Sequence, residues 1–73
     1  MTIYQSIEEE IARARGKFPA FHSQHEAYAV ILEELDEFWE KVRRDEDGRS
    51  ELIQVAAMAI AAYRECNTWR EAR

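Results

Sequence analysis

The stretch VILEELDEFWEKV, residues 30–42, intersperses strongly hydrophobic residues with acidic ones. Its apolar residues recur every three or four positions, which is the spacing of one face of an α-helix. Most of the remaining positions are acidic, so like charges lie beside some of the most hydrophobic residues of the chain. Like charges at these spacings repel each other on a helix surface. The stretch therefore predicts a long amphipathic helix with a crowded acidic side.

The rest of the chain also has helical patterns and no strand-like alternation, so the predicted fold class is all-α with three helices. The first helix is predicted over about residues 3–15. Thr2 and Gln5 have the spacing of a capping box before it, and Gly16 is a suitable stop after it. The link KFPAFH then supplies Phe18 and Phe21, which are predicted to close the end of the helical bundle.

The second helix is predicted over about residues 23–45, with a capping box of Ser23 and Glu26. The polar turn RRDEDGRS, which contains Gly48, then joins it to an antiparallel third helix over about residues 49–66. A continuation of that helix through TWREAR is left open. The apolar face predicted for the second helix consists of Ala27, Tyr28, Ile31, Leu32, Leu35, Phe38, Trp39 and Val42.

The third helix is unusually rich in alanine. Its predicted buried face consists of Leu52, Ile53, Val55, Ala56, Ala59, Ile60 and Tyr63. Small residues spread around much of the helix favour close contacts on more than one side. We therefore expect an antiparallel helical hairpin that forms a four-helix-type bundle on homo-oligomerisation.

Length and composition restrict the class of protein further. The chain has 73 residues, which is predicted to form a single domain over 1–73, and one core of that size rarely supplies more than a few kcal/mol. The single cysteine, Cys66, excludes an internal disulfide and favours a reducing, cytoplasmic location, so association or metal binding is expected to add stability. The longest apolar stretch is too short for a membrane span. The net charge of −5 disfavours nucleic-acid binding.

Oxygen-bearing side chains stand at matching positions on the two arms of the predicted hairpin. Glu34 and Glu37 are three residues apart on the second helix, and Glu51 and Gln54 are three apart on the third. An antiparallel hairpin would bring the two pairs together. Hard cations such as Mg²⁺ or Mn²⁺ prefer such ligands. The alternative is a solvated acidic face with ordinary surface ion pairs.

The segments EELDE (residues 33–37) and ELIQ (residues 51–54) resemble the paired EExxE and ExxD motif of the MazG-like, all-α nucleoside triphosphate pyrophosphohydrolases. The flanking text HEAYAVILEELDEFWEKV and ELIQVAAMAIAAYREC is also similar to that family, and the similarity covers roughly residues 22–66. The first motif is complete. In the second, Gln54 stands where the family pattern has Asp.

The resemblance implies Mg²⁺-dependent hydrolysis of a nucleoside or deoxynucleoside triphosphate to the monophosphate and pyrophosphate, by a homodimer or homotetramer. Carried over by position, the metal ligands would be Glu34, Glu37, Glu51 and Gln54. Glu33 and Glu37 would take part in catalysis, with Glu33 either a further ligand or the group that orients the attacking water. The uncharged Gln54 implies weaker metal binding, and loss of activity stays open.

Two other residues are candidates for contact with the substrate. Lys41 follows Glu37 by one helical turn and could touch phosphate, although a surface ion pair is an equal alternative. Trp39 could stack on a base, although aromatic residues at helical spacing are more often part of a core. His22 and His25 lack the partner set of a zinc site. Two non-enzymatic hypotheses remain: a non-catalytic oligomerisation or nucleotide-binding module with the same fold, and a subunit that completes a bundle with another chain.

Overall fold

The computed structural model describes residues 1–66 as three helices, with no strand among them. These are α1 (Ile3–Lys17), α2 (Gln24–Arg43) and α3 (Arg49–Glu65). The all-helical prediction is confirmed, and the predicted ends differ from the observed ones by one or two residues. The proposed continuation through TWREAR lies outside the described residues.

The start of α1 follows the sequence signal, whereas its end does not. Thr2 and Gln5 form the predicted capping box: the Gln5 backbone N–H donates to the Thr2 hydroxyl at 3.1 Å, and the Thr2 N–H donates to the Gln5 side chain at 2.7 Å. Gly16 was the wrong stop, because α1 continues to Lys17. Phe18 is extended, with φ −133° and ψ 149°, as the residue before Pro19 is sterically required to be. Proline therefore ends this helix.

The ends of α2 are set by side-chain and backbone hydrogen bonds. The Ser23 hydroxyl accepts from the Glu26 N–H at 3.2 Å, while the Glu26 carboxylate accepts from the N–H of His22, one residue before the cap. At the other end, the N–H of Glu46 donates to the Lys41 carbonyl and that of Asp45 donates to the Val42 carbonyl. Asp45 has φ 56°, so this is a Schellman ending with aspartate in the left-handed position.

Gly48 lies in the turn between α2 and α3, as predicted. Its φ is −102°, so it does not supply a left-handed turn; it is the N-cap of α3. A Cβ at this position would lie 2.8 Å from the Phe38 ring and 3.5 Å from the Lys41 Cβ. Glycine is favoured here because the Phe38 ring of α2 occupies the space that a side chain would need.

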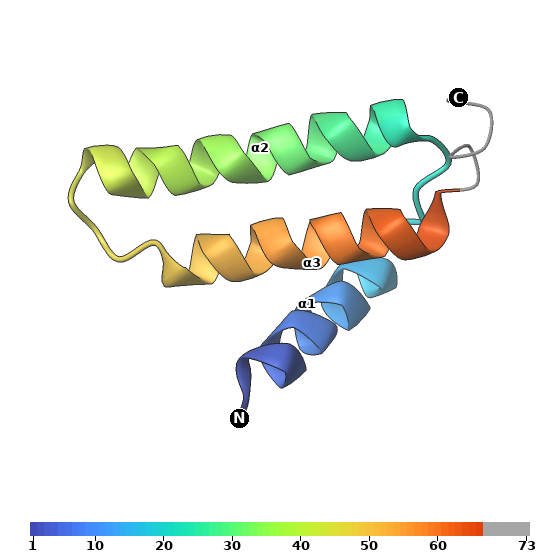
Figure 1. The fold of residues 1–73 in the computed structure, drawn as a ribbon, viewed down its shortest axis with the longest axis horizontal. Helices are drawn as coiled ribbons and strands as arrows, with labels where there is room; N and C mark the ends of the chain where they lie inside the picture. Colours follow the sequence, from blue (N-terminus) through green and yellow to red (C-terminus); the bar gives the residue numbers. More distant parts are fainter. Residues whose placement is uncertain (67–73) are drawn as a thin grey trace.

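Figure 1 shows α2 and α3 running antiparallel, with α1 crossing beside α3. Helix α3 packs against both other helices and forms the centre of the chain. The core lies where α3 meets α1 and α2, and alanine supplies half of its ten buried residues. These ten are Ile7, Ile11, Ala14, Phe21, Ala27, Ala57, Met58, Ala61, Ala62 and Cys66.

The predicted core is only partly correct. Phe21 is buried, but Phe18 is 64% exposed and does not close the bundle end. On α3 the predicted face is only partly correct: Ile53, Ala56 and Ile60 are half-buried against the core, but the fully buried residues of this helix are Ala57, Met58, Ala61 and Ala62. Three members of the predicted face, Leu52, Ala59 and Tyr63, are exposed. The alanine-rich sequence gave no contrast between the two sides of this helix, so the position of α1 decided which side was covered.

Much of the predicted apolar face of α2 is also exposed in the single chain. Ala27 is buried and Ile31 is half-buried, whereas Tyr28, Leu32, Leu35, Trp39 and Val42 are exposed. A face this wide exceeds what one neighbouring helix can cover. Across residues 1–66, none of the helices has the length and apolar character that crossing a bilayer requires.

Candidate functional site

The antiparallel register of α2 and α3 brings the predicted ligand positions level with each other. Lys41 and Gly48 lie side by side at the turn. Both helices rise by about 1.5 Å per residue, so equal numbers of residues counted back from this contact remain level. By this count Glu37 is level with Leu52, one residue beyond Glu51, and Glu34 is level with Val55, one residue beyond Gln54. The two three-residue spacings therefore match across the hairpin.

Two of these side chains contain carboxylate oxygens that are buried without a partner. Glu34 and Glu51 are half-buried, and the Oε2 of Glu34 and the Oε1 of Glu51 are covered but make no hydrogen bond. A covered, unpaired carboxylate oxygen costs free energy that a donor or a cation would offset. One such oxygen therefore comes from each arm of the hairpin.

The charges around Glu34 add to this cost. Burial raises the pKa of Glu34 above its usual value, and the carboxylates of Glu37, Glu10 and Glu33 raise it further. Arg13 acts in the opposite direction, but the net shift is upward. The region around Glu34 therefore has too little positive charge for its carboxylates.

Helix α1 contributes to this region, which the sequence did not reveal. Glu10 and Arg13 form an ion pair on α1, with the Arg13 Nε donating to the Glu10 Oε1 at 3.0 Å, and both influence Glu34 of α2 electrostatically. Their three-residue spacing predicts the ion pair. It gives no indication that α1 would bring the pair to Glu34, because the angle at which α1 crosses the hairpin is a tertiary property.

A cavity of about 400 Å³ lies beside the acidic residues, between the end of α1, the following loop and α2. It is lined by aromatic and aliphatic side chains together with three carboxylates. The principal lining residues are Phe18, Phe21, Met58, Glu26, Glu33 and Glu34. The cavity has the mixed lining typical of a small-molecule site.

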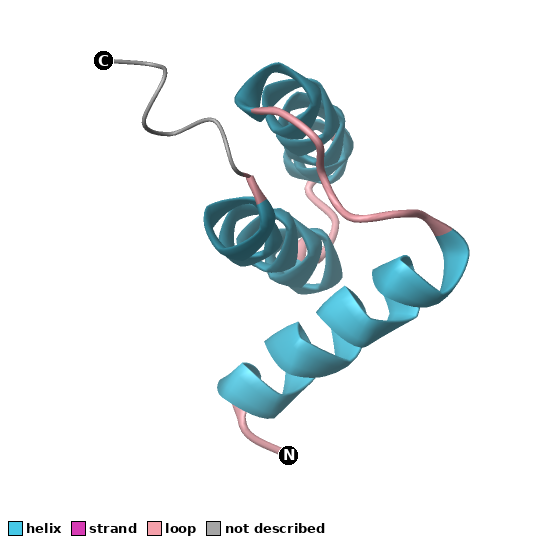
Figure 2. Ribbon diagram, turned by 90° about the vertical axis from the view of Figure 1, so that its right-hand side faces the viewer, coloured by secondary structure: helices cyan, strands magenta, loops and turns pink. Residues whose placement is uncertain are grey.

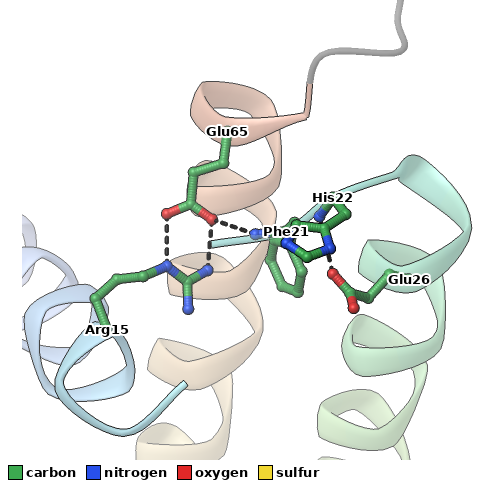
Figure 3. Close-up of polar contacts among 5 residues, drawn as sticks. All are labelled: Arg15, Phe21, His22, Glu26 and Glu65. Atoms are coloured by element: carbon green, nitrogen blue, oxygen red, sulfur yellow. Dashed lines mark hydrogen bonds and ion pairs between the residues drawn. The ribbon is translucent and has the colours of Figure 1, made fainter. Parts of the chain in front are cut away.

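Figure 3 shows the polar contacts that hold one wall of this cavity. The Arg15 guanidinium donates two hydrogen bonds to the Glu65 carboxylate, and Glu65 also accepts from the Phe21 N–H at 3.0 Å. Arg15 also lies 5.0 Å from the centre of the Phe21 ring. These contacts connect the end of α1, the loop and the end of α3. They lower the pKa of Glu65, chiefly through the Arg15 hydrogen bonds.

The remaining predicted site residues are distributed differently. Glu33 and Glu37 are exposed, and Glu33 lines the cavity. Lys41 is half-buried and lies 3.5 Å from the Glu46 carboxylate, so it pairs with the turn and not with Glu37. Trp39 is 55% exposed. Five helical steps separate it from Glu34, a rotation of about 140°, so it lies on another side of α2.

The side chains of residues 1–66 do not form a ready metal cage. Within this range no group of three or more acidic, histidine or cysteine side chains is arranged to hold a metal ion. His22 and His25 are exposed, and Cys66 is buried with its pKa raised by that burial, which is typical of an inert thiol. The ligand positions are therefore level along the hairpin without closing around a common centre.

Comparison with known proteins finds no family model, curated protein or solved structure that matches this chain significantly. The MazG-like resemblance of EELDE and ELIQ stays a prediction that depends on the residues themselves.

Proposed function

We propose that this chain is a Mg²⁺-dependent hydrolase that converts nucleoside or deoxynucleoside triphosphates to the monophosphate and pyrophosphate. The observation that carries the proposal is the pair of unpartnered carboxylate oxygens, Glu34 Oε2 and Glu51 Oε1, on matching arms of the hairpin. They belong to the two segments, EELDE and ELIQ, that resemble the MazG-like motif. Damaged or surplus nucleotides in the cytoplasm are the substrates we favour.

The donor types of the hairpin suit a hard divalent cation, although the side chains of residues 1–66 do not close around a common centre. Carboxylate and amide oxygens are the ligands that Mg²⁺ and Mn²⁺ take, and Mg²⁺ usually completes its shell with water and substrate phosphate. Glu34, Glu37, Glu51 and Gln54 would hold the ion. Because Gln54 is uncharged, only three of these four positions are anionic, which favours tight binding only when the triphosphate also supplies oxygens. The bound ion would offset the carboxylate repulsion and the charge on the phosphates.

The chemical step needs few other groups. A water attacks the α-phosphorus, the bond from that phosphorus to the bridging oxygen breaks, and pyrophosphate leaves with that oxygen. Glu33 is exposed at the cavity and is suited to orient this water and accept its proton, with Glu37 beside it. Lys41 would exchange its Glu46 partner for phosphate. The cavity near Glu33 is a better binding place for the nucleobase of the substrate than the surface around Trp39, because Trp39 lies on another side of α2.

Pyrophosphate release from a panel of dNTPs and NTPs, with Mg²⁺ or Mn²⁺, tests this proposal. We expect turnover that disappears on addition of a chelator and in the Glu37→Gln variant. Glu9→Gln removes an exposed carboxylate from α1 and is the matched control, which should remain active. A folded wild-type chain that releases no pyrophosphate from any nucleotide would rule out the hydrolase.

A non-catalytic nucleotide-binding or oligomerisation module is the second candidate, and Gln54 in place of Asp favours it. Calorimetry with Mg²⁺ and a nonhydrolysable triphosphate separates the two. Binding without turnover of the natural nucleotides would indicate the module. The variant Gln54→Asp adds the missing carboxylate, and a gain of turnover in it alone would show that this position decides between the two functions.

We also propose that the chain acts as a homodimer or a homotetramer of such dimers, with the hairpins forming a four-helix-type bundle. Among residues 1–66 no large side chain is fully buried. A chain of this length buries only about 60% of its unfolded surface when it folds alone. Association would supply the apolar burial that the single chain lacks.

A further inference from the structure

The cavity between α1, the following loop and α2 combines core residues with an exposed aromatic ring. Its volume of about 400 Å³ is that of a small-molecule site. Three of its lining residues, Ala14, Phe21 and Met58, belong to the buried core. Phe18 also lines it but is 64% exposed, so a phenyl ring is in contact with water there. Figure 2 shows the loop running beside the ends of α1 and α2, where this cavity lies. A ligand with an apolar body would cover the exposed ring.

Helix α2 contributes a regular row of side chains to the cavity. Glu26, Val30 and Glu33 line it at spacings of four and three residues, which keep side chains on one side of a helix. Glu26 and Glu33 are two helical turns apart, or about 10 Å along the helix axis. The row therefore has a carboxylate at each end and an apolar residue in the middle. Glu34 adds a second carboxylate at the Glu33 end.

The lining of the cavity has an excess of negative charge. It contains the carboxylates of Glu26, Glu33 and Glu34, and Arg15 is its one cationic side chain among the described residues. The Arg15 guanidinium donates two hydrogen bonds to Glu65, so a further carboxylate already offsets its charge. The Oε2 of Glu34 is covered and makes no hydrogen bond within residues 1–66. The cavity should therefore attract a cation and repel an anion.

An elongated cation suits this row better than a metal ion does. A divalent ion contacts its ligands at about 2.0–2.6 Å, so it cannot bind two carboxylates that are two helical turns apart. Across residues 1–66, no three acidic, histidine or cysteine side chains are arranged to hold a metal ion. The Glu26 carboxylate also accepts a hydrogen bond from the His22 N–H at 2.9 Å, which keeps it at the start of α2. A ligand must reach both ends of the row to use both carboxylates.

We propose that this cavity binds a linear diamine. One ammonium group would pair with Glu26 and the other with Glu33 and Glu34, because ammonium groups donate charge-assisted hydrogen bonds to carboxylates. The methylene chain between them would lie along Val30 and cover the Phe18 ring, which removes apolar surface from water on both sides. The site does not depend on the proposed hydrolase. In an active enzyme, the diamine would compete with the nucleobase for the cavity and inhibit turnover.

Isothermal titration calorimetry in metal-free, low-salt buffer tests the site with heptanediamine, whose terminal amino groups can span the row. Heptanediol has the same chain without charge, and propanediamine has both charges on a chain too short to reach both ends. We expect heptanediamine to bind about tenfold more tightly than either compound, since it alone forms both charged contacts. No binding of heptanediamine, or equal binding of the diol or of the short diamine, overturns the proposal.

Two conservative variants locate the ends of the bound diamine. Glu26→Gln and Glu33→Gln each remove a charge and keep an oxygen acceptor, so the hydrogen bond from the His22 N–H can persist and circular dichroism should show an unchanged fold. We expect each variant to weaken heptanediamine binding by about two- to fivefold and to leave heptanediol binding unchanged. Glu9→Gln makes the same change to an exposed α1 residue outside the cavity lining and should bind like the wild type. If heptanediamine bound the two cavity variants as tightly as the wild type, the assignment of its ends would be wrong.

The titrations contain neither metal nor nucleotide, so their outcome is independent of turnover. A chain that binds heptanediamine in this way and hydrolyses no nucleotide refutes only the hydrolase. A chain that hydrolyses nucleotides and does not bind heptanediamine refutes only the diamine site.

Discussion

Arg15 at the end of α1 and Glu65 at the end of α3 form a two-pronged ion pair, with the Arg15 Nε 2.6 Å from one Glu65 oxygen and an Nη 2.5 Å from the other. Fifty residues separate them in the chain. The same carboxylate accepts a hydrogen bond from the Phe21 N–H, so a single side chain connects α1, the loop and α3.

Glu65→Gln should lower the free energy of unfolding by about 1–2 kcal/mol, because it removes charge-assisted hydrogen bonds that are largely shielded from water. Urea denaturation followed by circular dichroism measures this. Glu8→Gln is the matched control: it breaks the Glu8–Arg64 pair, which also joins α1 to α3 but is exposed, and exposed pairs contribute little. If both variants lost the same free energy of unfolding, the shielded Arg15–Glu65 pair would not be more stabilising than the exposed Glu8–Arg64 pair.

The Glu65 pair should also make stability depend on acid pH. Arg15 lowers the pKa of Glu65 below the usual glutamate value of about 4.3. A group with a lowered folded pKa contributes stability above its unfolded pKa, and the contribution disappears as pH falls through the folded pKa. The difference in unfolding free energy between the wild type and Glu65→Gln should therefore be constant near neutral pH and shrink below about pH 4. A difference that does not change with pH would argue against the ionised pair.

Glu34→Gln should stabilise the metal-free chain at neutral pH by a few tenths of a kcal/mol to about 1 kcal/mol. Burial and three neighbouring carboxylates raise the pKa of Glu34, so its ionised form is unfavourable in the folded state once the pH exceeds the folded pKa. The same substitution should abolish the rise in melting temperature that Mg²⁺ gives the wild type. Thermal scans with and without Mg²⁺ measure both effects, with Glu9→Gln expected to behave like the wild type. A variant that loses stability without metal would refute this account.

The two glycines should respond in opposite ways to replacement by alanine. At Gly48 the new methyl group would meet the Phe38 ring at 2.8 Å, so the variant should lose about 1–3 kcal/mol as the hairpin end is overpacked. At Gly16 nothing lies within 4 Å and the residue is inside α1, so alanine should add about 0.5–1 kcal/mol through helix propensity. Denaturation midpoints of the two variants measure the contrast. A stabilised Gly48→Ala would show that the close approach of Phe38 is not maintained.

Local signals in the sequence predicted the elements well and their ends less well. The Thr2–Gln5 capping box holds as predicted, because all of its atoms lie within one helical turn. Gly16 was a misleading stop signal, since Pro19 nearby has the stronger steric effect on the backbone. Asp45 in a left-handed conformation was not foreseen, because glycine three residues later was the more obvious candidate for the turn.

By itself, the sequence determined three helices and the matching positions of Glu34, Glu37, Glu51 and Gln54 on two of them. These depend on spacing and on contacts within a few residues. Only the tertiary structure decided which side of the alanine-rich α3 is covered and that Glu10 and Arg13 of α1 come to Glu34. Each of these depends on the angle at which α1 crosses the hairpin. That angle is set by packing between residues far apart in the chain, such as Arg15 and Glu65, and no local pattern encodes it.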